Sequence, residues 1–221
     1  VDSGFPGIMN SVPRLRRSML DAYLQRIIDR DLPEQGYSVR RPETLRRWLS
    51  AYAAASSTTT SYSRLLAATT GGDGGQPAKE TTIAYRDHLS QLWLLDPVPG
   101  WIPANNPIRR LQQAPKHQLA DPALAARLLD LSAGALLGQA GAHMAGPLFE
   151  SLVSLGVRVA AQAAEAKVFH LRTSGGDREI DRRGSSSASR SNWHLRSQTR
   201  LCGISAGYEN SFPAGWPISW W

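Results

Sequence analysis

The sequence predicts a mostly helical α+β protein, and three observations lead to this class. Apolar residues recur at three- and four-residue spacing through several long segments, which is the period of an amphipathic helix. Short extended segments follow, at 94–101, 117–119 and 167–173. From residue 182 onward neither period is present. With 221 residues and 42% hydrophobic residues, the chain is long enough to bury a core.

These patterns divide the chain into four parts. Residues 1–13 are expected to be a frayed lead-in, because Gly4, Pro6 and Gly7 interrupt them. Residues 14–112 are predicted to form a helical, winged-helix-like module. Residues 113–181 should form a partial α/β domain, and residues 182–221 a disordered or non-native tail.

The first two helices have the clearest patterns. The first is predicted over residues 14–31 and should end at Pro33 and Gly36. The second should start at Pro42. Its spacing indicates a buried stripe made of Leu45, Trp48, Leu49, Tyr52 and Ala53.

Two further helices are predicted before residue 94. Thr60 or Ser61 should cap a short helix, and Thr81 or Thr82 the next one. The residues expected to point inward on that second helix are Ile83, Tyr85, Leu89, Leu92 and Trp93. A short helix, a turn, a longer helix and an extended ribbon form the order of a winged helix.

The helix that Thr81 or Thr82 is expected to cap has an exposed side of mixed charge. It carries Glu80, Arg86, Asp87, His88 and Gln91, whereas helices that read DNA grooves are usually basic or amide-rich. Packing or contact with a protein partner is therefore an alternative to DNA reading.

The next part of the chain mixes helix and strand signals. Asp121 should cap a helix that begins at Pro122, and residues 138–146 should form a loop. An apolar helix is predicted from Pro147 to about Lys167, buried on most sides. The strand at 167–173 then leads through a Gly-Gly turn to a short strand that carries Glu179 and Asp181.

The net charge of +7 and the pI of about 10.1 are compatible with nucleic-acid contact. The candidate nucleic-acid-binding residues are Arg40, Arg41, Arg46, Arg47 and Arg86. The basic residues are spread along the chain, so an Arg-rich composition with a solvated helix face explains them as well.

Several classes of site are excluded by the sequence. The single Cys202 excludes an internal disulfide and a cysteine-based zinc site, and the five histidines lack metal-ligand spacing. No Gly is followed by Lys, so no phosphate-binding P-loop is present. We therefore expect no metal and no cofactor. The longest apolar stretch, from Leu152, is broken by Arg158, and no apolar leader is seen, so we expect a cytoplasmic protein without a membrane span.

Several long stretches, which follow one another in the same order along the chain, resemble a known protein family. They include YLQRIIDRDLPE, RRPETLRRWLSAYAA, YRDHLSQLWLLDPVPGW, APKHQLADPALAARLL and HLRTSGGDREID. From about Gly4 to Asp181 the sequence resembles the C-terminal half of bacterial predicted AAA-type P-loop ATPases, which carry a C-terminal domain of unknown function with a restriction-endonuclease-like fold. The resemblance implies an N-terminal nucleotide-binding domain, which this sequence lacks.

The resemblance also implies a divalent-metal nuclease centre. It places Glu150 on the first core helix, Asp181 at a hairpin and a Glu-x-Lys motif on the next strand. No such strand follows Asp181 here, so the centre is incomplete, and two carboxylates alone bind Mg²⁺ weakly. Glu150 is then explained by a backbone hydrogen bond or a pair with Arg172, and Asp181 as a turn residue.

The leading interpretation is a non-catalytic, truncated C-terminal fragment of such an ATPase. The first alternative is a DNA-binding module that acts through the winged-helix-like region and the arginines. The second is a degenerate Mg²⁺-dependent nuclease domain completed by another chain. DNA and a protein are thus the candidate partners. The tail holds four of the seven Trp residues, and a reading-frame shift near residue 182 is the hypothesis for it.

Overall fold

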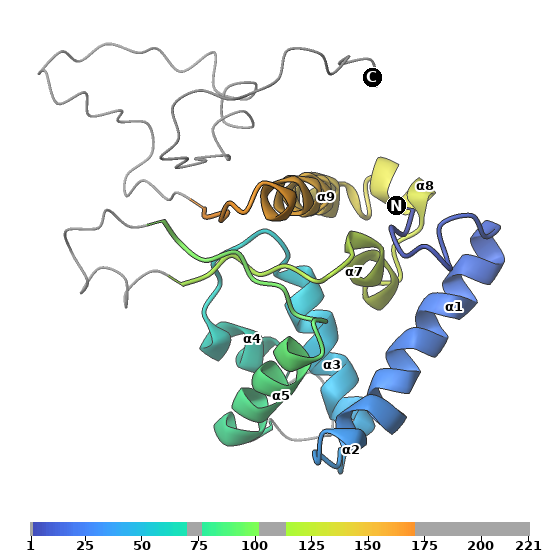
Figure 1. Ribbon diagram of the computed structural model, residues 1–221. Coiled ribbons are helices and arrows are strands. Elements are labelled where there is room, and N and C mark those ends of the chain that lie inside the picture. Colours follow the sequence, from blue (N-terminus) through green and yellow to red (C-terminus); the bar gives the residue numbers. More distant parts are fainter. Residues whose placement is uncertain (1, 70–76, 102–113, 171–221) are drawn as a thin grey trace, which may run out of the picture.

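The computed structural model describes residues 2–69, 77–101 and 114–170, and helices make up most of these (Figure 1). The elements in chain order are α1 (Pro13–Arg26), the π-helical turn η1 (Ile27–Asp31), α2 (Leu32–Glu34), α3 (Pro42–Ala54), α4 (Tyr62–Ala68), α5 (Lys79–Gln91), α7 (Pro122–Leu128), α8 (Ala133–Leu137) and α9 (Ala142–Ala163). In this described part the β-structure consists of isolated bridges. The prediction of a mostly helical protein is confirmed.

The first predicted helix continues past Pro33 to Glu34, the last residue of α2, and Gly36 lies in the turn that follows. Proline has no N–H and its ring clashes with the carbonyl four residues earlier. The wider η1 turn comes just before it, with the Leu32 N–H donating to the Ile27 carbonyl. Gly36 has a φ of +80°, a left-handed conformation that favours glycine, and the Tyr37 N–H returns to the Leu32 carbonyl at 3.0 Å.

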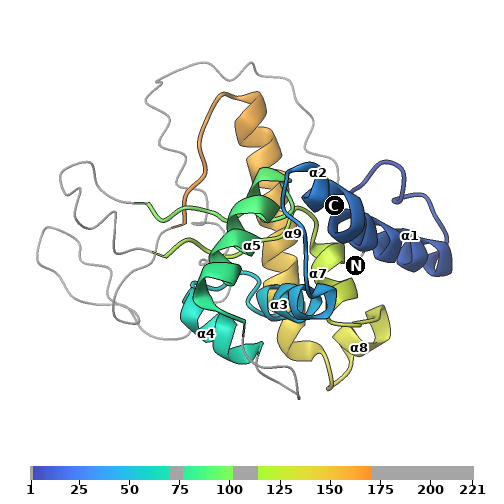
Figure 2. The same cartoon turned by 90° about the horizontal axis from the view of Figure 1, so that it is seen from below.

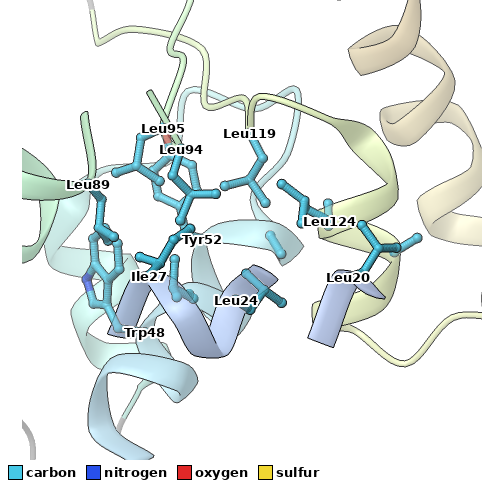
Figure 3. Packing of buried hydrophobic residues seen from close by; sticks show 14 of the residues in the cluster. Leu20, Leu24, Ile27, Trp48, Tyr52, Leu89, Leu94, Leu95, Leu119 and Leu124 are labelled. Atoms are coloured by element: carbon cyan, nitrogen blue, oxygen red, sulfur yellow. The ribbon is translucent and has the colours of Figure 1, made fainter. Parts of the chain in front are cut away.

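Helix α3 forms the centre of the core, as its apolar stripe predicts. All five stripe residues are buried, and Trp48 and Tyr52 stack with their ring centroids 5.5 Å apart. Figure 3 shows both rings near Leu24 of α1, Ile27 of η1 and Leu94 of the segment that follows α5.

Helix α5 corrects two sequence expectations. It begins at Lys79 behind Pro77, so Thr82 lies inside the helix and donates to the Lys79 carbonyl instead of capping it. Tyr85 and Leu89 are buried as predicted, but Ile83 is 40% exposed and Trp93 is 76% exposed. Trp93 has a left-handed φ of 58°, which ends the helix and turns Leu94 into the core in its place.

The extended segments at 94–101 and 114–120 pair as an antiparallel ribbon. Val98 and Lys116 exchange both backbone hydrogen bonds, at 2.9 and 2.8 Å. His117 pairs on its other side with the turn after α3, through Thr58. His170 joins the first segment by a parallel bridge to Gly100. The predicted short strand near His117 is thus an extended, paired segment.

Asp121 caps α7 as predicted, and it also fixes the N-terminal segment. One carboxylate oxygen accepts from the Ala123 N–H at 2.7 Å. The other accepts from the Ser3 hydroxyl at 2.7 Å and the Gly4 N–H at 2.8 Å. The expectation of a frayed lead-in is therefore wrong, and the N-terminus lies beside α7 and α8 (Figure 1).

The region after α7 differs from its prediction. The expected loop at 138–146 is partly helical, because α9 already begins at Ala142 and carries Pro147 inside its second turn. Helix α8 was not predicted. The expectation that the apolar helix is buried on most sides is also wrong, because Phe149, Leu152 and Val159 are 47%, 47% and 61% exposed. By length and composition α9 alone among the described helices could cross a membrane, a test that soluble core helices also pass.

One buried cluster joins most of these elements. Helix α7 contacts α1, α3 and α9; it lies between α3 and α9 in the view of Figure 1 and beside α9 in the view of Figure 2. The cluster extends from Ile8 to Leu148 and so includes residues on both sides of position 112. The proposed boundary there stays a prediction, and residues 171–221, with the predicted tail, lie outside the described residues.

Candidate functional site

An open cavity of about 550 Å³ lies where the segment before α3 meets the start of α5. Most of its lining residues are polar or charged, and they come from both segments: Tyr37, Ser38, Arg40, Arg41, Thr44, Pro77, Ala78, Thr81 and Tyr85. Arg41 directly precedes α3, and Ala78 directly precedes α5. The cavity is therefore bordered by the N-terminal ends of two 13-residue helices.

Neither helix end is capped by a side chain. The N-cap residues, Arg41 and Ala78, make no capping hydrogen bond. The first N–H groups of a helix then need another acceptor, and the helix dipole favours a negative one. Each first turn also carries an exposed carboxylate, Glu43 and Glu80, and neither of these lines the cavity.

The two guanidinium groups of the cavity are available for a partner. Arg40 and Arg41 are exposed, and within the described ranges neither guanidinium forms an ion pair or a hydrogen bond. A guanidinium offers five N–H donors in a planar arrangement that matches carboxylate and phosphate oxygens. Both residues line the same cavity, and none of its described lining residues is a carboxylate.

Hydroxyl groups complete the lining. Burial raises the pKa of Tyr37, and it raises the pKa of Tyr85 to about 12. Both hydroxyls thus stay protonated at neutral pH and can donate. Arg40 lowers the pKa of Tyr37, and Arg41 lowers that of Tyr85, because a nearby cation favours the phenolate. In both tyrosines the effect of burial is larger. Tyr37 also stacks on His88, with ring centroids 4.6 Å apart.

The other three candidate arginines have partners within the chain. Arg46 is hydrogen-bonded to Gln25 of α1, and Arg47 donates to Thr44 at 3.4 Å. Arg86 pairs with Asp87 at 2.8 Å and lies over the Tyr62 ring at 5.4 Å. The structure therefore brings together only Arg40 and Arg41 of the five.

Glu150, the candidate nuclease carboxylate, forms an ion pair with Lys116 of the ribbon. The pair is half-buried, beside a hollow of only about 20 Å³ that Val153, Val157 and His170 help to line. Two turns along α9, Arg158 donates to the Asp96 carbonyl at 2.6 Å and pairs with its carboxylate. Both pairs attach α9 to the ribbon.

The rest of the implied nuclease centre is not described. Asp181 and Arg172 lie outside the described residues, so the roles expected for them stay predictions. Within the described residues Glu150 pairs with Lys116. Among the residues that the structure describes, no three or more His, Cys, Asp or Glu side chains come together as a possible metal site.

Sequence reasoning named both arginines of the cavity but missed the cavity itself. Residues 37–44 and 77–85 are about forty positions apart, and no local pattern shows that they meet. The available signals were Pro42 and Pro77, which mark helix starts beside Arg41 and Lys79.

Comparison with known proteins identifies a family for the chain. The model of a family described as a domain of unknown function (DUF8612) matches residues 1–135. No curated protein and no solved structure matches the chain. The matched range contains the Arg40–Arg41 cavity and both halves of the ribbon, whereas Glu150 lies beyond it.

Proposed function

The chain belongs to the DUF8612 family, and from the geometry of its cavity we propose that it is a non-catalytic module that binds the phosphate backbone of DNA. One observation carries the proposal. Arg40 and Arg41, which have no ion-pair partner among the described residues, line a cavity that is bordered by the uncapped N-terminal ends of α3 and α5. Phosphate is the anion that such an arrangement suits best, because oriented N–H groups and guanidinium donors act on it together.

The order of the elements supports DNA rather than a small anion. Helices α4 and α5 are followed by the ribbon at 94–101 and 114–120, which is the order of a winged helix. The cavity is open and lies at the start of α5, the helix that corresponds to the recognition helix. We propose the winged-helix-like arrangement on this basis.

Contact with phosphates is favoured over reading of bases. The exposed residues of α5 include Lys79, Glu80, Ile83, Asp87 and Gln91, which are of mixed charge and type. Major-groove readers use donors and acceptors such as Arg, Asn and Gln over several turns. We therefore expect binding with little sequence preference and a strong dependence on salt.

The non-catalytic part of the proposal rests on Glu150. Its charge is balanced by Lys116 of the ribbon. The descent from an AAA-type ATPase with a restriction-endonuclease-like domain also remains our proposal, supported by the ordered sequence stretches that resemble it. In that case the chain would be the DNA-contacting part of a larger machine.

Titration of a fluorescent 20-bp duplex at several salt concentrations, followed by anisotropy, tests the proposal. Each phosphate contact contributes about −0.9 to the slope of log K against log [salt]. The double variant Arg40→Gln/Arg41→Gln should therefore make the slope shallower by about 1.8. Arg14→Gln/Arg17→Gln on α1 is the matched control, because it removes the same charge from two exposed arginines elsewhere.

Two results would contradict the proposal. One is the absence of duplex binding by the unaltered chain at low salt. The other is an equal change of slope in both double variants, which would mean that net charge alone attracts the duplex.

A nuclease is the second candidate, and the position of Lys116 is the observation that favours it. A lysine beside the helix glutamate is what the implied centre needs, although here it comes from the ribbon. Mg²⁺-dependent cleavage of DNA that disappears in Glu150→Gln would support this candidate and exclude the non-catalytic one.

A further inference from the structure

Tyr85 of α5 is a buried tyrosine whose hydroxyl has no hydrogen-bond partner in the described part of the chain. The residue is only 3% exposed, and it lines the Arg40–Arg41 cavity. Its ring is fixed between Trp48 and Tyr37, with centroid distances of 5.9 and 6.1 Å. Burial raises the pKa of the hydroxyl, and no hydrogen bond contributes to that shift. Because buried hydroxyl groups normally have a partner, this one is available to a ligand that enters the cavity.

The donors of the cavity exceed what one internal phosphate of a DNA strand can use. Arg40 lowers the pKa of Tyr37 and Arg41 that of Tyr85, so each hydroxyl lies within electrostatic reach of a guanidinium. Each guanidinium adds five N–H donors. An internal phosphate has one negative charge and two oxygens that are not part of the chain. None of the described lining residues is a carboxylate that could take up the remaining donors.

A phosphate monoester suits this lining better than an internal phosphodiester. It carries a charge of about −1.5 to −2 at neutral pH and three strong acceptor oxygens. The two guanidinium groups can balance that charge, and the two tyrosine hydroxyls can donate to its oxygens. A monoester is attached on one side only, so it can enter a concave site, whereas an internal phosphate has a sugar on both sides. The volume of about 550 Å³ is typical of pockets that enclose small molecules, roughly 300–1,000 Å³, and leaves room for the attached sugar.

From these observations we propose that the cavity binds the terminal phosphate monoester of a DNA strand. Arg40 and Arg41 balance its charge, and the hydroxyl of Tyr85 donates to one of its oxygens. The inference rests on the proposed function and adds which phosphate of the DNA the cavity prefers. Internal phosphates bind the same arginines more weakly, so the chain gathers at strand ends and breaks that carry a phosphate.

Anisotropy titrations of the full chain with three DNA probes test this preference. The probes share one double-stranded sequence and an internal fluorescent label: an open duplex with 5′-phosphates, the same duplex with 5′-hydroxyls, and a dumbbell whose ends are closed by loops. We expect the phosphorylated duplex to bind about tenfold more tightly than the other two, which should bind alike. Net charge does not account for such a difference, because two added phosphates change the charge of a duplex of about twenty base pairs by only about a tenth.

Tyrosine variants test whether the cavity causes the preference. Tyr85→Phe keeps the ring that packs on Trp48, so it should remove most of the tenfold difference and leave binding of the dumbbell unchanged. Tyr37→Phe, at a partly exposed position, should act in the same direction. Tyr52→Phe is the matched control, because this tyrosine is also buried but donates to the Gln118 carbonyl at 3.5 Å and does not line the cavity. It should keep the full difference.

The possible contrary results fall on different claims. Equal binding of the three probes by the unaltered chain would overturn the inference and leave the proposed function intact, whereas no binding of any probe at low salt would overturn both. A difference that persists in both Tyr85→Phe and Tyr37→Phe would place the preference outside the cavity. Displacement of the phosphorylated duplex by thymidine 5′-monophosphate at a concentration comparable to that of the duplex would show that the ligand is a free phosphate monoester and not a DNA end.

Discussion

Two charged regions of the molecule, the Arg40–Arg41 cavity and the contact between α9 and the ribbon, differ in how their charges are balanced. In the first, two guanidinium groups share an open cavity with no carboxylate partner among the described residues. In the second, Lys116 pairs with Glu150 and Arg158 with Asp96, all four partly buried. Charges of the second kind hold elements of the chain together, whereas those of the first kind remain available for another molecule.

The comparison separates candidate sites that looked alike in the sequence. Glu150 and Arg40 were both candidate functional residues, but only the arginine is free to act on a ligand. Substitutions in the paired region should therefore change stability and not binding. Substitutions in the cavity should do the opposite.

The largest effect on stability is expected at Asp121, the most completely paired carboxylate described. Asp121→Ala removes the cap of α7 and leaves the buried Ser3 hydroxyl and the Gly4 N–H without their acceptor. We expect a loss of about 3 kcal/mol in the free energy of unfolding, measured in urea. Asp29→Ala, at an exposed carboxylate of η1, should cost less than about 0.5 kcal/mol. Similar losses in the two variants would contradict this assignment.

A smaller loss is expected from the ion pair that attaches α9. Glu150→Gln and Lys116→Met should each lower the unfolding free energy by about 1–2 kcal/mol, because each leaves a half-buried charge without its partner. The double variant should lose less than the sum of the two. A coupling energy near zero would show that the ion pair does not stabilise the attachment of α9. A change in DNA binding by these variants would contradict the distinction between the paired region and the cavity.

The smallest effect concerns His117, beside Lys116 in the ribbon. Burial lowers the pKa of its ring, which lies against Tyr52 and Tyr62 with Nε2 2.6 Å from the Thr60 carbonyl. The unfolded chain therefore takes up this proton at a higher pH than the folded one. Stability should be complete above about pH 6.5 and fall as the pH drops from there toward the folded pKa, by at most about 1.4 kcal/mol per pH unit.

Urea unfolding at several pH values between neutral and mildly acidic checks this prediction. His117→Gln keeps a donor for the Thr60 carbonyl but cannot take a charge, so its stability should depend less on pH. His143→Gln, at an exposed position of α9, should behave like the unaltered chain. An unchanged pH dependence in His117→Gln would show that another group is responsible.

The sequence was sufficient where local signals and burial agree. The α3 stripe from Leu45 to Ala53 is buried as predicted, because a proline start and a regular period define both the helix and its inner face. Asp121 was recognised as a cap because it directly precedes Pro122. Thr82 was misjudged as a cap because Pro77 starts α5 earlier than the Thr pair suggests.

The sequence was insufficient wherever a feature depends on which distant part of the chain packs against it. The apolar pattern of α9 identifies a face but does not say whether anything covers it, and Leu152 is exposed. The partner of Glu150 is 34 positions away, on a segment with a different local structure. For the same reason the cavity between residues 37–44 and 77–85 could not be seen before the fold was known.

The central claim, that the unpaired arginines of the cavity bind DNA phosphates, is tested most directly by measuring the salt dependence of duplex binding and the unfolding free energy on the same variants. For Arg40→Gln/Arg41→Gln the account predicts a slope shallower by about 1.8 and a stability within about 0.5 kcal/mol of the unaltered chain. Arg14→Gln/Arg17→Gln should change neither appreciably. A cavity variant that binds duplex with the unaltered slope would contradict the account.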